Sequence, residues 1–270
     1  MNRSPVRAGL LVAVCATFAA PDVKAAVLTI DDFTTPIALQ TLLGANANDP
    51  FDANGQAGVQ FPVSGSGILG SERDSQFWVG FGPENEEWSF GVDPARGLFW
   101  DADPNIHVNM NLEWDGFGDG TTFGSTLSPN PLRADLTGYT GFQLDFGFNT
   151  QPLDIRWIVG NKDLTGGLIP LGISQFDLTI PGGQTEPFAI AMPFSEFAAP
   201  FADFGIPAAD YGDVNTLALS IFSADGVTGN SFELRSIAAT PVPEPSSSAI
   251  FAGVLLGASA FRRKRAQKID

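Results

Sequence analysis

Cysteine and histidine are nearly absent from the 270 residues, which contain one of each. The lone cysteine, Cys15, has no partner for an intrachain disulfide. A zinc site of the usual ligands needs several cysteines and histidines, so none is expected. A catalytic Ser-His-Asp or Cys-His arrangement would have to use His107, which alternates with apolar neighbours and so points to the polar side of a predicted strand. These scarcities argue against thiol, zinc and histidine-dependent chemistry.

Basic side chains are also few, with 14 lysines and arginines against 30 acidic residues and a net charge of −16. Nucleic-acid affinity depends on basic side chains that displace counterions from phosphates, so we expect no nucleic-acid partner. Residues 26–241 carry 6 basic and 27 acidic side chains, a net charge of −21. Such a surface suits cations or neutral polymers, and an acidic polysaccharide would need a bridging divalent ion.

The N-terminus has the pattern of a secretory signal peptide over residues 1–25. Two arginines precede an apolar stretch at residues 8–20, which is shorter than the ~20 residues that a membrane-spanning helix needs. A small-residue site predicts cleavage by signal peptidase between Ala25 and Ala26. Cleavage there removes Cys15 and exports the rest of the chain.

The C-terminus, residues 240–270, combines three features in a fixed order. The motif Val242-Pro243-Glu244-Pro245 comes first, and its prolines favour an extended, accessible segment. A hydrophobic segment at residues 246–261 then predicts a short transmembrane helix. The tail at residues 262–270 follows, with the basic cluster Arg262, Arg263, Lys264 and Arg265. By the positive-inside rule this cluster stays cytoplasmic, which places the N-terminus outside.

This tail resembles the PEP-CTERM sorting signal of Gram-negative bacteria, whose hallmarks are a Val-Pro-Glu-Pro motif, a hydrophobic segment and an arginine-rich end. The resemblance implies processing by an exosortase, a membrane-embedded cysteine protease that acts at or near the motif. It also implies transient anchoring in the inner membrane and delivery to the cell surface or the exopolysaccharide matrix. The alternative is an anchor that stays attached, although such an anchor gives no reason for the Pro-Glu-Pro element.

Residues 26–239 predict a single all-β domain, an antiparallel sandwich of jelly-roll type. Apolar residues alternate with period two in several windows separated by glycine-rich turns. The inward positions so predicted are Ile106, Val108, Met110, Leu112, Trp114; Phe142, Leu144, Phe146, Phe148; Leu153, Ile155, Trp157, Val159; Phe188, Ile190, Met192; Leu217, Leu219, Ile221; and Phe232, Leu234. The one helix-like stretch, residues 195–204, is expected to form a turn or two at most.

Residues 135–239 also resemble galactose-binding-like jelly rolls, a group that includes carbohydrate-binding modules. The resemblance rests on three segments in family order, namely Asp135–Leu144, Ala191–Phe197 and Phe232–Ile237. It implies the fold, and it carries over no ligand residue to this chain.

Tryptophans and carboxylates supply the candidate binding residues. Trp114 and Trp157 are in phase with core positions, whereas Trp78, Trp88 and Trp100 lie in irregular acid-rich sequence and are the candidates to stack on a sugar. Burial in the core is the competing interpretation for these three. A glycosidase would need only two carboxylates. The candidates, which lie near Trp114 and these three tryptophans, are Glu86, Glu87, Asp101, Asp103 and Glu113.

A structural Ca²⁺ is the other use for acidic turns, because this ion takes six to eight oxygen ligands. The candidate ligands are Asp101, Asp103, Asp115 and Asp119, and the alternative is an ordinary aspartate-rich turn. The sequence as a whole predicts an exported, non-enzymatic matrix or surface component that binds polysaccharide. A purely structural surface protein and a secreted glycoside hydrolase remain as alternatives.

Overall fold

A computed structural model describes residues 26–43, 58–79, 86–117, 130–161 and 171–242 of the chain. These residues all belong to one compact unit, residues 26–243. The signal peptide, most of the sorting tail and the predicted transmembrane segment at 246–261 lie outside the described residues. Within the described part, no helix is long and apolar enough to span a bilayer.

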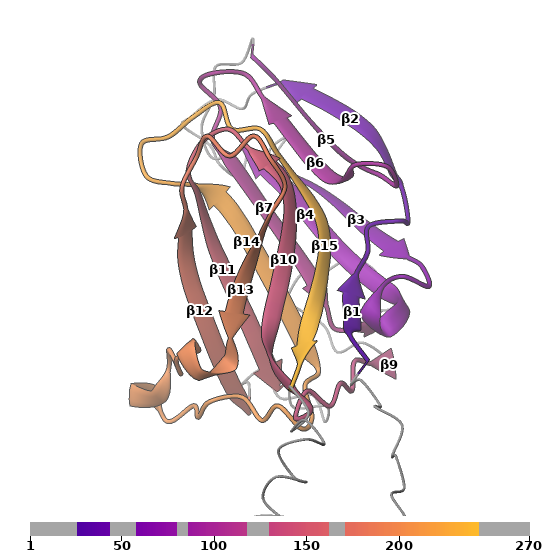
Figure 1. The fold of residues 1–270 in the computed structure, drawn as a ribbon, viewed down its shortest axis with the longest axis vertical. Helices are drawn as coiled ribbons and strands as arrows, with labels where there is room; N and C mark the ends of the chain where they lie inside the picture. The colour runs from indigo at the N-terminus through magenta and orange to yellow at the C-terminus, as the bar shows by residue number, and fades with distance from the viewer. Residues whose placement is uncertain (1–25, 44–57, 80–85, 118–129, 162–170, 243–270) are drawn as a thin grey trace, which may run out of the picture. The chain divides into compact units, whose positions relative to one another are not determined.

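Two antiparallel sheets make up the fold (Figure 1). The first, sheet A, has the order β13-β10-β15-β6-β5-β2, with β1 also paired to β15. Its strands are β1 (Leu28–Asp31), β2 (Ile37–Leu43), β5 (Glu87–Asp93), β6 (Gly97–Ala102), β10 (Tyr139–Asn149), β13 (Phe188–Pro193) and β15 (Phe232–Pro241).

The second, sheet B, has the order β12-β11-β14-β7-β4-β3. Its strands are β3 (Gly58–Ser64), β4 (Glu72–Val79), β7 (Val108–Trp114), β11 (Leu153–Asn161), β12 (Gly172–Ile180) and β14 (Thr216–Ser223). A small ladder joins β8 (Gly116–Phe117) to β9 (Asn130–Pro131), and three single 3₁₀ turns are η1 (Leu69–Ser71), η2 (Phe194–Glu196) and η3 (Ala202–Phe204). This antiparallel sandwich confirms the predicted fold class.

Aromatic rings from the two sheets meet in the core between them. Phe77 of β4 stacks on Phe90 of β5 with ring centroids 4.0 Å apart, and Phe142 of β10 contacts Trp157 of β11 at 4.7 Å. Large buried aromatics dominate the energetics of such a core. The apolar face of each strand is therefore fixed toward the partner sheet, and the alternate residues must face outward.

The period-two prediction of inward residues is confirmed over most of its length, since Met110, Leu144, Ile155 and Leu219 are all at most 1% exposed. Phe148 is an exception and is only half-buried. The register between β10 and β15 shifts between Phe146 and Phe148, which marks a β-bulge and interrupts the alternation there. The helix-like stretch at 195–204 yields only the short turns η2 and η3.

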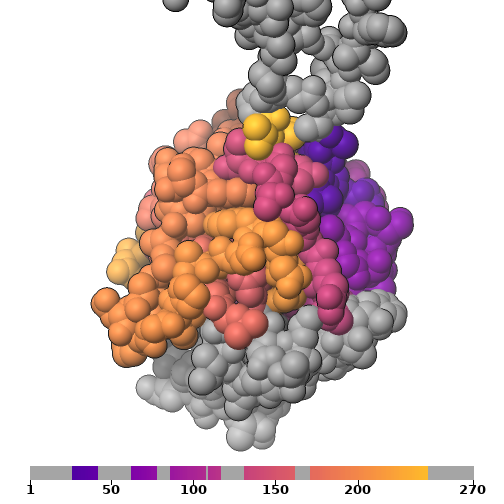
Figure 2. Space-filling model, turned by 90° about the horizontal axis from the view of Figure 1, so that it is seen from below, coloured from indigo at the N-terminus to yellow at the C-terminus, as the bar shows by residue number. Residues whose placement is uncertain are grey.

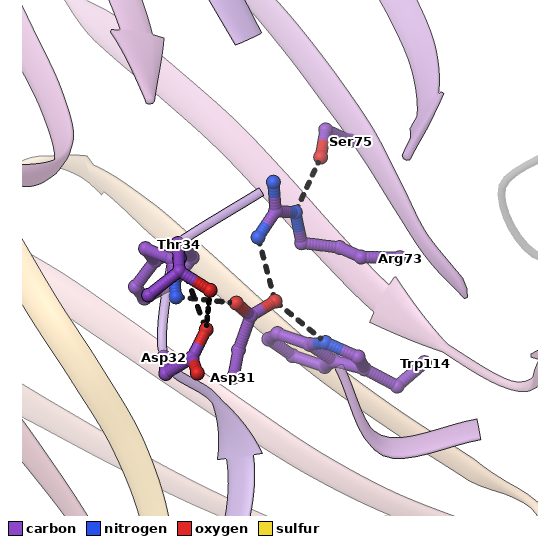
Figure 3. A network of polar contacts seen from close by, with 7 residues as sticks. Asp31, Asp32, Thr34, Arg73, Ser75 and Trp114 are labelled. Atoms are coloured by element: carbon purple, nitrogen blue, oxygen red, sulfur yellow. Dashed lines mark hydrogen bonds and ion pairs between the residues drawn. The ribbon is translucent and has the colours of Figure 1, made fainter. Parts of the chain in front are cut away.

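A buried polar network ties β1 to sheet B (Figure 3). The Asp31 carboxylate accepts hydrogen bonds from Arg73 Nη1 at 2.6 Å and from Trp114 Nε1 at 3.1 Å. Arg73 Nε donates to Ser75 Oγ at 3.1 Å, and its guanidinium carbon lies 5.0 Å from the centre of the Phe33 ring. The network holds the inward side chains of β4 in place, and so fixes the register of its outward residues.

Both ends of the compact unit lie at the same end of the sandwich, here called the lower end. Leu28 at the start of β1 pairs with Ala239 near the end of β15, and Tyr139 at the start of β10 pairs with Pro241. Val242 N–H then donates to the Gly138 carbonyl at 3.0 Å. Figure 1 shows β15 running down to this end, where the chain leaves toward the sorting motif.

Candidate functional site

The outer face of sheet B carries a continuous line of polar residues across five neighbouring strands. The strand register places them directly opposite one another, and we call them the polar row: Gln76 (β4), Asn111 (β7), Ser220 (β14), Arg156 (β11) and Asp177 (β12). None of the five is buried. Neighbouring strands lie about 4.8 Å apart, so the row is about 19 Å long.

Core packing fixes the outward direction of this row. Each row residue on β4, β7, β14 and β11 has a fully buried neighbour one position away along its strand. These neighbours are Phe77, Leu112, Leu219 and Trp157, all 0% exposed. Because side chains alternate across a strand, their neighbours must face away from the core. The row therefore follows from the same alternation that makes the sandwich.

Hydrogen bonds within the face orient one end of the row. Arg156 Nε donates to Asp177 Oδ1 at 2.8 Å, and Gln175 Nε2 donates to Asp177 Oδ2 at 2.6 Å. Both members of the ion pair are about half exposed, so water can reach them and the pair adds little stability. It instead presents guanidinium and carboxylate groups in a fixed arrangement, which suits hydrogen bonding to a hydroxylated ligand.

One flank of the polar row is partly apolar. Phe222 lies two residues from Ser220 on β14 and is half-buried, with Asp154 opposite it on β11. An aromatic ring beside amide, hydroxyl and charged groups is the usual composition of a site that fixes a ligand by a few polar contacts. Trp78 occupies the β4 position opposite Asn109 in the same flank, but its side chain lies outside those described.

The other flank holds two carboxylates on neighbouring strands. Asp74 of β4 and Glu113 of β7 are directly opposite in the register. Their exposed fractions are 5% and 3%, and both make further polar interactions. Directly opposed residues have Cβ atoms about 4.5–5.5 Å apart, so these two acidic side chains start from neighbouring points at this end of the face.

Two of the three tryptophans that were candidates to stack on a sugar are buried, and the side chain of the third, Trp78, lies outside those described. Trp88 and Trp100 are each 1% exposed and stack on each other in the core with centroids 4.7 Å apart. Their burial excludes the ring stacking on a sugar that the sequence left open for these two residues. Trp114 and Trp157, predicted as core, are fully buried and stacked at 5.8 Å.

The acidic candidates Asp101 and Asp103 line a polar pocket of about 180 Å³ on sheet A, together with Glu87, Thr41 and Ser89. Thr41, Ser89 and Asp101 form one row across β2, β5 and β6. Asp103 Oδ2 accepts a hydrogen bond from the Glu87 backbone N–H at 2.7 Å, and Glu86 instead binds Asn105. Of the carboxylates that the sequence placed near tryptophans, Glu87, Asp101 and Asp103 thus lie together, whereas Glu113 lies on sheet B.

No group of three or more acidic, histidine or cysteine side chains gathers as a metal site among the residues that the structure describes. Asp115 is 4% exposed and lies after β7, away from the pocket on sheet A. Asp119 falls outside the described ranges. The predicted Ca²⁺ ligands are therefore split over two places, and the ion itself remains a prediction.

Sequence reasoning missed the polar row. Its signal was present, because Asn111, Ser220 and Arg156 alternate with the inward residues that the periodicity identified. What the sequence did not provide was the strand order that makes these residues neighbours.

Comparison with known proteins assigns the C-terminal segment. Residues 241–265 match the PEP-CTERM protein-sorting motif, which confirms the identification made from Val242-Pro243-Glu244-Pro245 and the basic cluster. The motif implies export, a C-terminal membrane anchor before cleavage, and processing by an exosortase. No curated protein matches the chain.

Several solved structures share a general likeness with the sandwich. A family 11 carbohydrate-binding module from Clostridium thermocellum, in complex with a β-1,3-1,4-mixed-linked tetrasaccharide, is 13% identical with a TM-score of 0.40, covering 82% of this chain and 99% of that one. The family 11 xylanase from Neocallimastix patriciarum is 9% identical with a TM-score of 0.30, covering 74% and 95%. At such low identities and TM-scores, what those proteins bind says nothing about the ligand of this chain.

Proposed function

We propose that this exported protein is a non-enzymatic component of the cell surface or exopolysaccharide matrix, and that it binds neutral polysaccharide along the polar row of sheet B. The observation that carries the proposal is the alignment of Gln76, Asn111, Ser220, Arg156 and Asp177 across five strands. Before processing, the anchored chain has its N-terminus and its sandwich on the outer side of the inner membrane.

The chemistry of the row suits a sugar chain. Amide, hydroxyl, guanidinium and carboxylate groups supply both donors and acceptors, which matches the hydroxyl groups of a glycan. The length of about 19 Å accommodates several sugar units end to end. The net charge of −21 over residues 26–241 disfavours anionic polymers and leaves neutral ones as the expected ligands.

Affinity electrophoresis through gels that contain neutral polysaccharides tests this function. We expect retardation of the wild-type protein, and a loss of retardation in Gln76→Ala and Asn111→Ala. Gln143→Ala is the matched control, since Gln143 is also a half-buried glutamine but lies on the outer face of sheet A. If no polysaccharide retards the wild type, a purely structural surface protein is the better description.

The opposed carboxylates Asp74 and Glu113 favour one second function, hydrolysis of a glycosidic bond on the same face. A retaining glycosidase needs two carboxyl groups about 5–5.5 Å apart. Release of reducing ends from a polysaccharide would identify this activity, and Glu113→Gln should abolish it. Glu86→Gln should leave it unchanged, because Glu86 lies apart from this pair and binds Asn105.

A further inference from the structure

An apolar tip projects from the lower end of the sandwich. Three side chains compose it: Leu171, which is 62% exposed, Phe201 at 42% and Phe204 at 81%. Figure 2, which looks at the molecule from below, shows the loop that bears these phenylalanines standing out at the edge of the surface. Large apolar side chains grouped at such exposure mark an interaction site more often than single exposed residues do.

The loop that carries the tip is held firmly against the sandwich. Gln175 and Ala198 exchange two backbone hydrogen bonds of 2.8 Å, and Phe197 stacks on Phe176 at 5.4 Å. The turn η3 is closed by hydrogen bonds of 3.0 Å from Phe204 and Gly205, and Gly205 takes the left-handed φ of 81°. Phe197 fills the interior position, so Phe201 and Phe204 are left outside on a fixed support.

Leu171 lies on a segment that adjoins the phenylalanine loop. The backbone N–H of Ile173 donates to the Pro207 carbonyl at 2.9 Å, so the start of β12 lies beside the end of the phenylalanine loop. A Cβ atom on Gly172 would lie only 2.7 Å from the Ala208 carbonyl oxygen, which shows how closely the two segments pack. The three apolar side chains are thus carried by two adjoining segments.

The tip lies at the end of the sandwich from which the sorting tail leaves. Pro193, just before the loop, pairs with Gly141, and Gly141 also pairs with Thr240 on β15. The hydrophobic segment of the tail begins at residue 246, four residues beyond Val242. Four residues span at most about 14 Å, so the anchored protein holds its lower end close to the bilayer.

We infer that the apolar tip docks on the lipid surface of the membrane that holds the uncleaved tail. Phe201 and Phe204 enter the interface between headgroups and acyl chains, while Asp203 and the acidic loop around them disfavour anionic lipid and select a zwitterionic surface. The contact is weak by itself. The tail supplies a high effective concentration, so docking lasts while the tail is attached and ends on cleavage. This inference rests on the sorting motif and not on polysaccharide binding.

Quenching by spin-labelled lipids tests the docking. The exported chain, residues 26–270, lacks Cys15 and keeps its tail. It is reconstituted in phosphatidylcholine and phosphatidylethanolamine vesicles with a fluorophore at Ala202→Cys. We expect strong quenching there, at least threefold above that of the same fluorophore at Thr185→Cys, which is exposed near the opposite end of β10, where Gln184 pairs with Asn149. Adding Phe201→Ser and Phe204→Ser should reduce the signal at Ala202 to the Thr185 level.

Unchanged quenching at Ala202 in the double serine variant would overturn the inference, because the tail alone would then account for the proximity. Equal quenching at Ala202 and Thr185 would overturn it as well. Quenching at Ala202 that appears only when the sorting protease is added to the vesicles would also overturn it, because the tip would then bind the protease and not lipid. Both phenylalanines are exposed, so the double variant should keep the wild-type circular dichroism.

Discussion

Asp31 and Arg73 form an ion pair of 2.6 Å in which both side chains are completely buried. Burial raises the pKa of the Asp31 carboxyl, and the Arg73 guanidinium, the Phe33 backbone N–H and Trp114 act in the opposite direction. A buried charge is tolerated only when it is paired and hydrogen-bonded. The pair therefore makes the position of β1 dependent on one residue of β4.

Arg73→Met should destabilise the protein by about 3–5 kcal/mol at neutral pH, because it leaves the Asp31 charge buried without its partner. Loss of the guanidinium raises the pKa of Asp31 further above the ordinary value of 3.8. The stability that protonated Asp31 contributes is present below 3.8 and is lost as the pH rises through the folded-state pKa. Denaturant unfolding should therefore show a defect that shrinks as the pH falls toward about 4.

The matched control for this variant is Arg156→Met, which removes an arginine from an exposed ion pair with Asp177. The expected loss of stability is about 0–1 kcal/mol, with no comparable pH dependence. Equal losses for the two variants would show that burial does not determine the strength of the Asp31–Arg73 pair.

Asp177→Ala should weaken polysaccharide binding roughly tenfold, because Asp177 accepts hydrogen bonds from both Arg156 and Gln175 and fixes one end of the polar row. The side chain is 53% exposed, so the melting temperature should hardly change. Isothermal titration with the polysaccharide that retards the wild type provides the measurement. An unchanged dissociation constant would remove this end of the row from the binding site.

Gly97→Ala should cost about 3 kcal/mol of unfolding free energy, through an unfavourable backbone angle and a steric clash. Gly97 has a φ of 86°, and a Cβ atom there would clash with the Leu234 carbonyl oxygen. Gly183→Ala separates the two causes, since Gly183 has a φ of 77° but open space around it. Its expected cost is about 1 kcal/mol, and chemical denaturation of both variants checks the difference.

Glu244→Ala should leave the chain uncleaved in the membrane fraction, because it alters the motif at which the exosortase is expected to act. Mass spectrometry of the wild-type protein from the culture supernatant should give a species that ends near Glu244 or Pro245. Glu233→Ala is the control in the folded part of the chain, and its processing should be normal. An intact C-terminus on the wild-type protein would identify a retained anchor.

The sandwich was predictable because its core obeys a local rule. In β7, β11 and β14 the inward positions that the periodicity identified are apolar, and each of those side chains that the structure describes is buried. The rule failed at Phe148. The bulge there comes from a register shift against β15, a strand more than 80 residues away in sequence. Alternation is a property of one strand, whereas a bulge depends on two.

The candidate site was harder to predict for the same reason. Asn111, Arg156 and Ser220 come from three strands that the chain visits in an order different from their order in the sheet. Trp88 and Trp100 follow the alternative that the sequence left open, burial in the core, because acid-rich surroundings in sequence did not prevent their rings from turning inward. Only the strand order decides which residues share a surface.

The strand that leads into the sorting tail, β15, lies inside sheet A with β10 on one side and β1 and β6 on the other. Hydrogen bonds between antiparallel strands run perpendicular to the strand direction. A force applied along the tail therefore loads the bonds on both sides of β15 together, in shear, and does not peel them apart one at a time. If the anchored protein binds a polymer through sheet B, a pull on that polymer is therefore resisted by β15 and the hydrogen bonds on both of its sides.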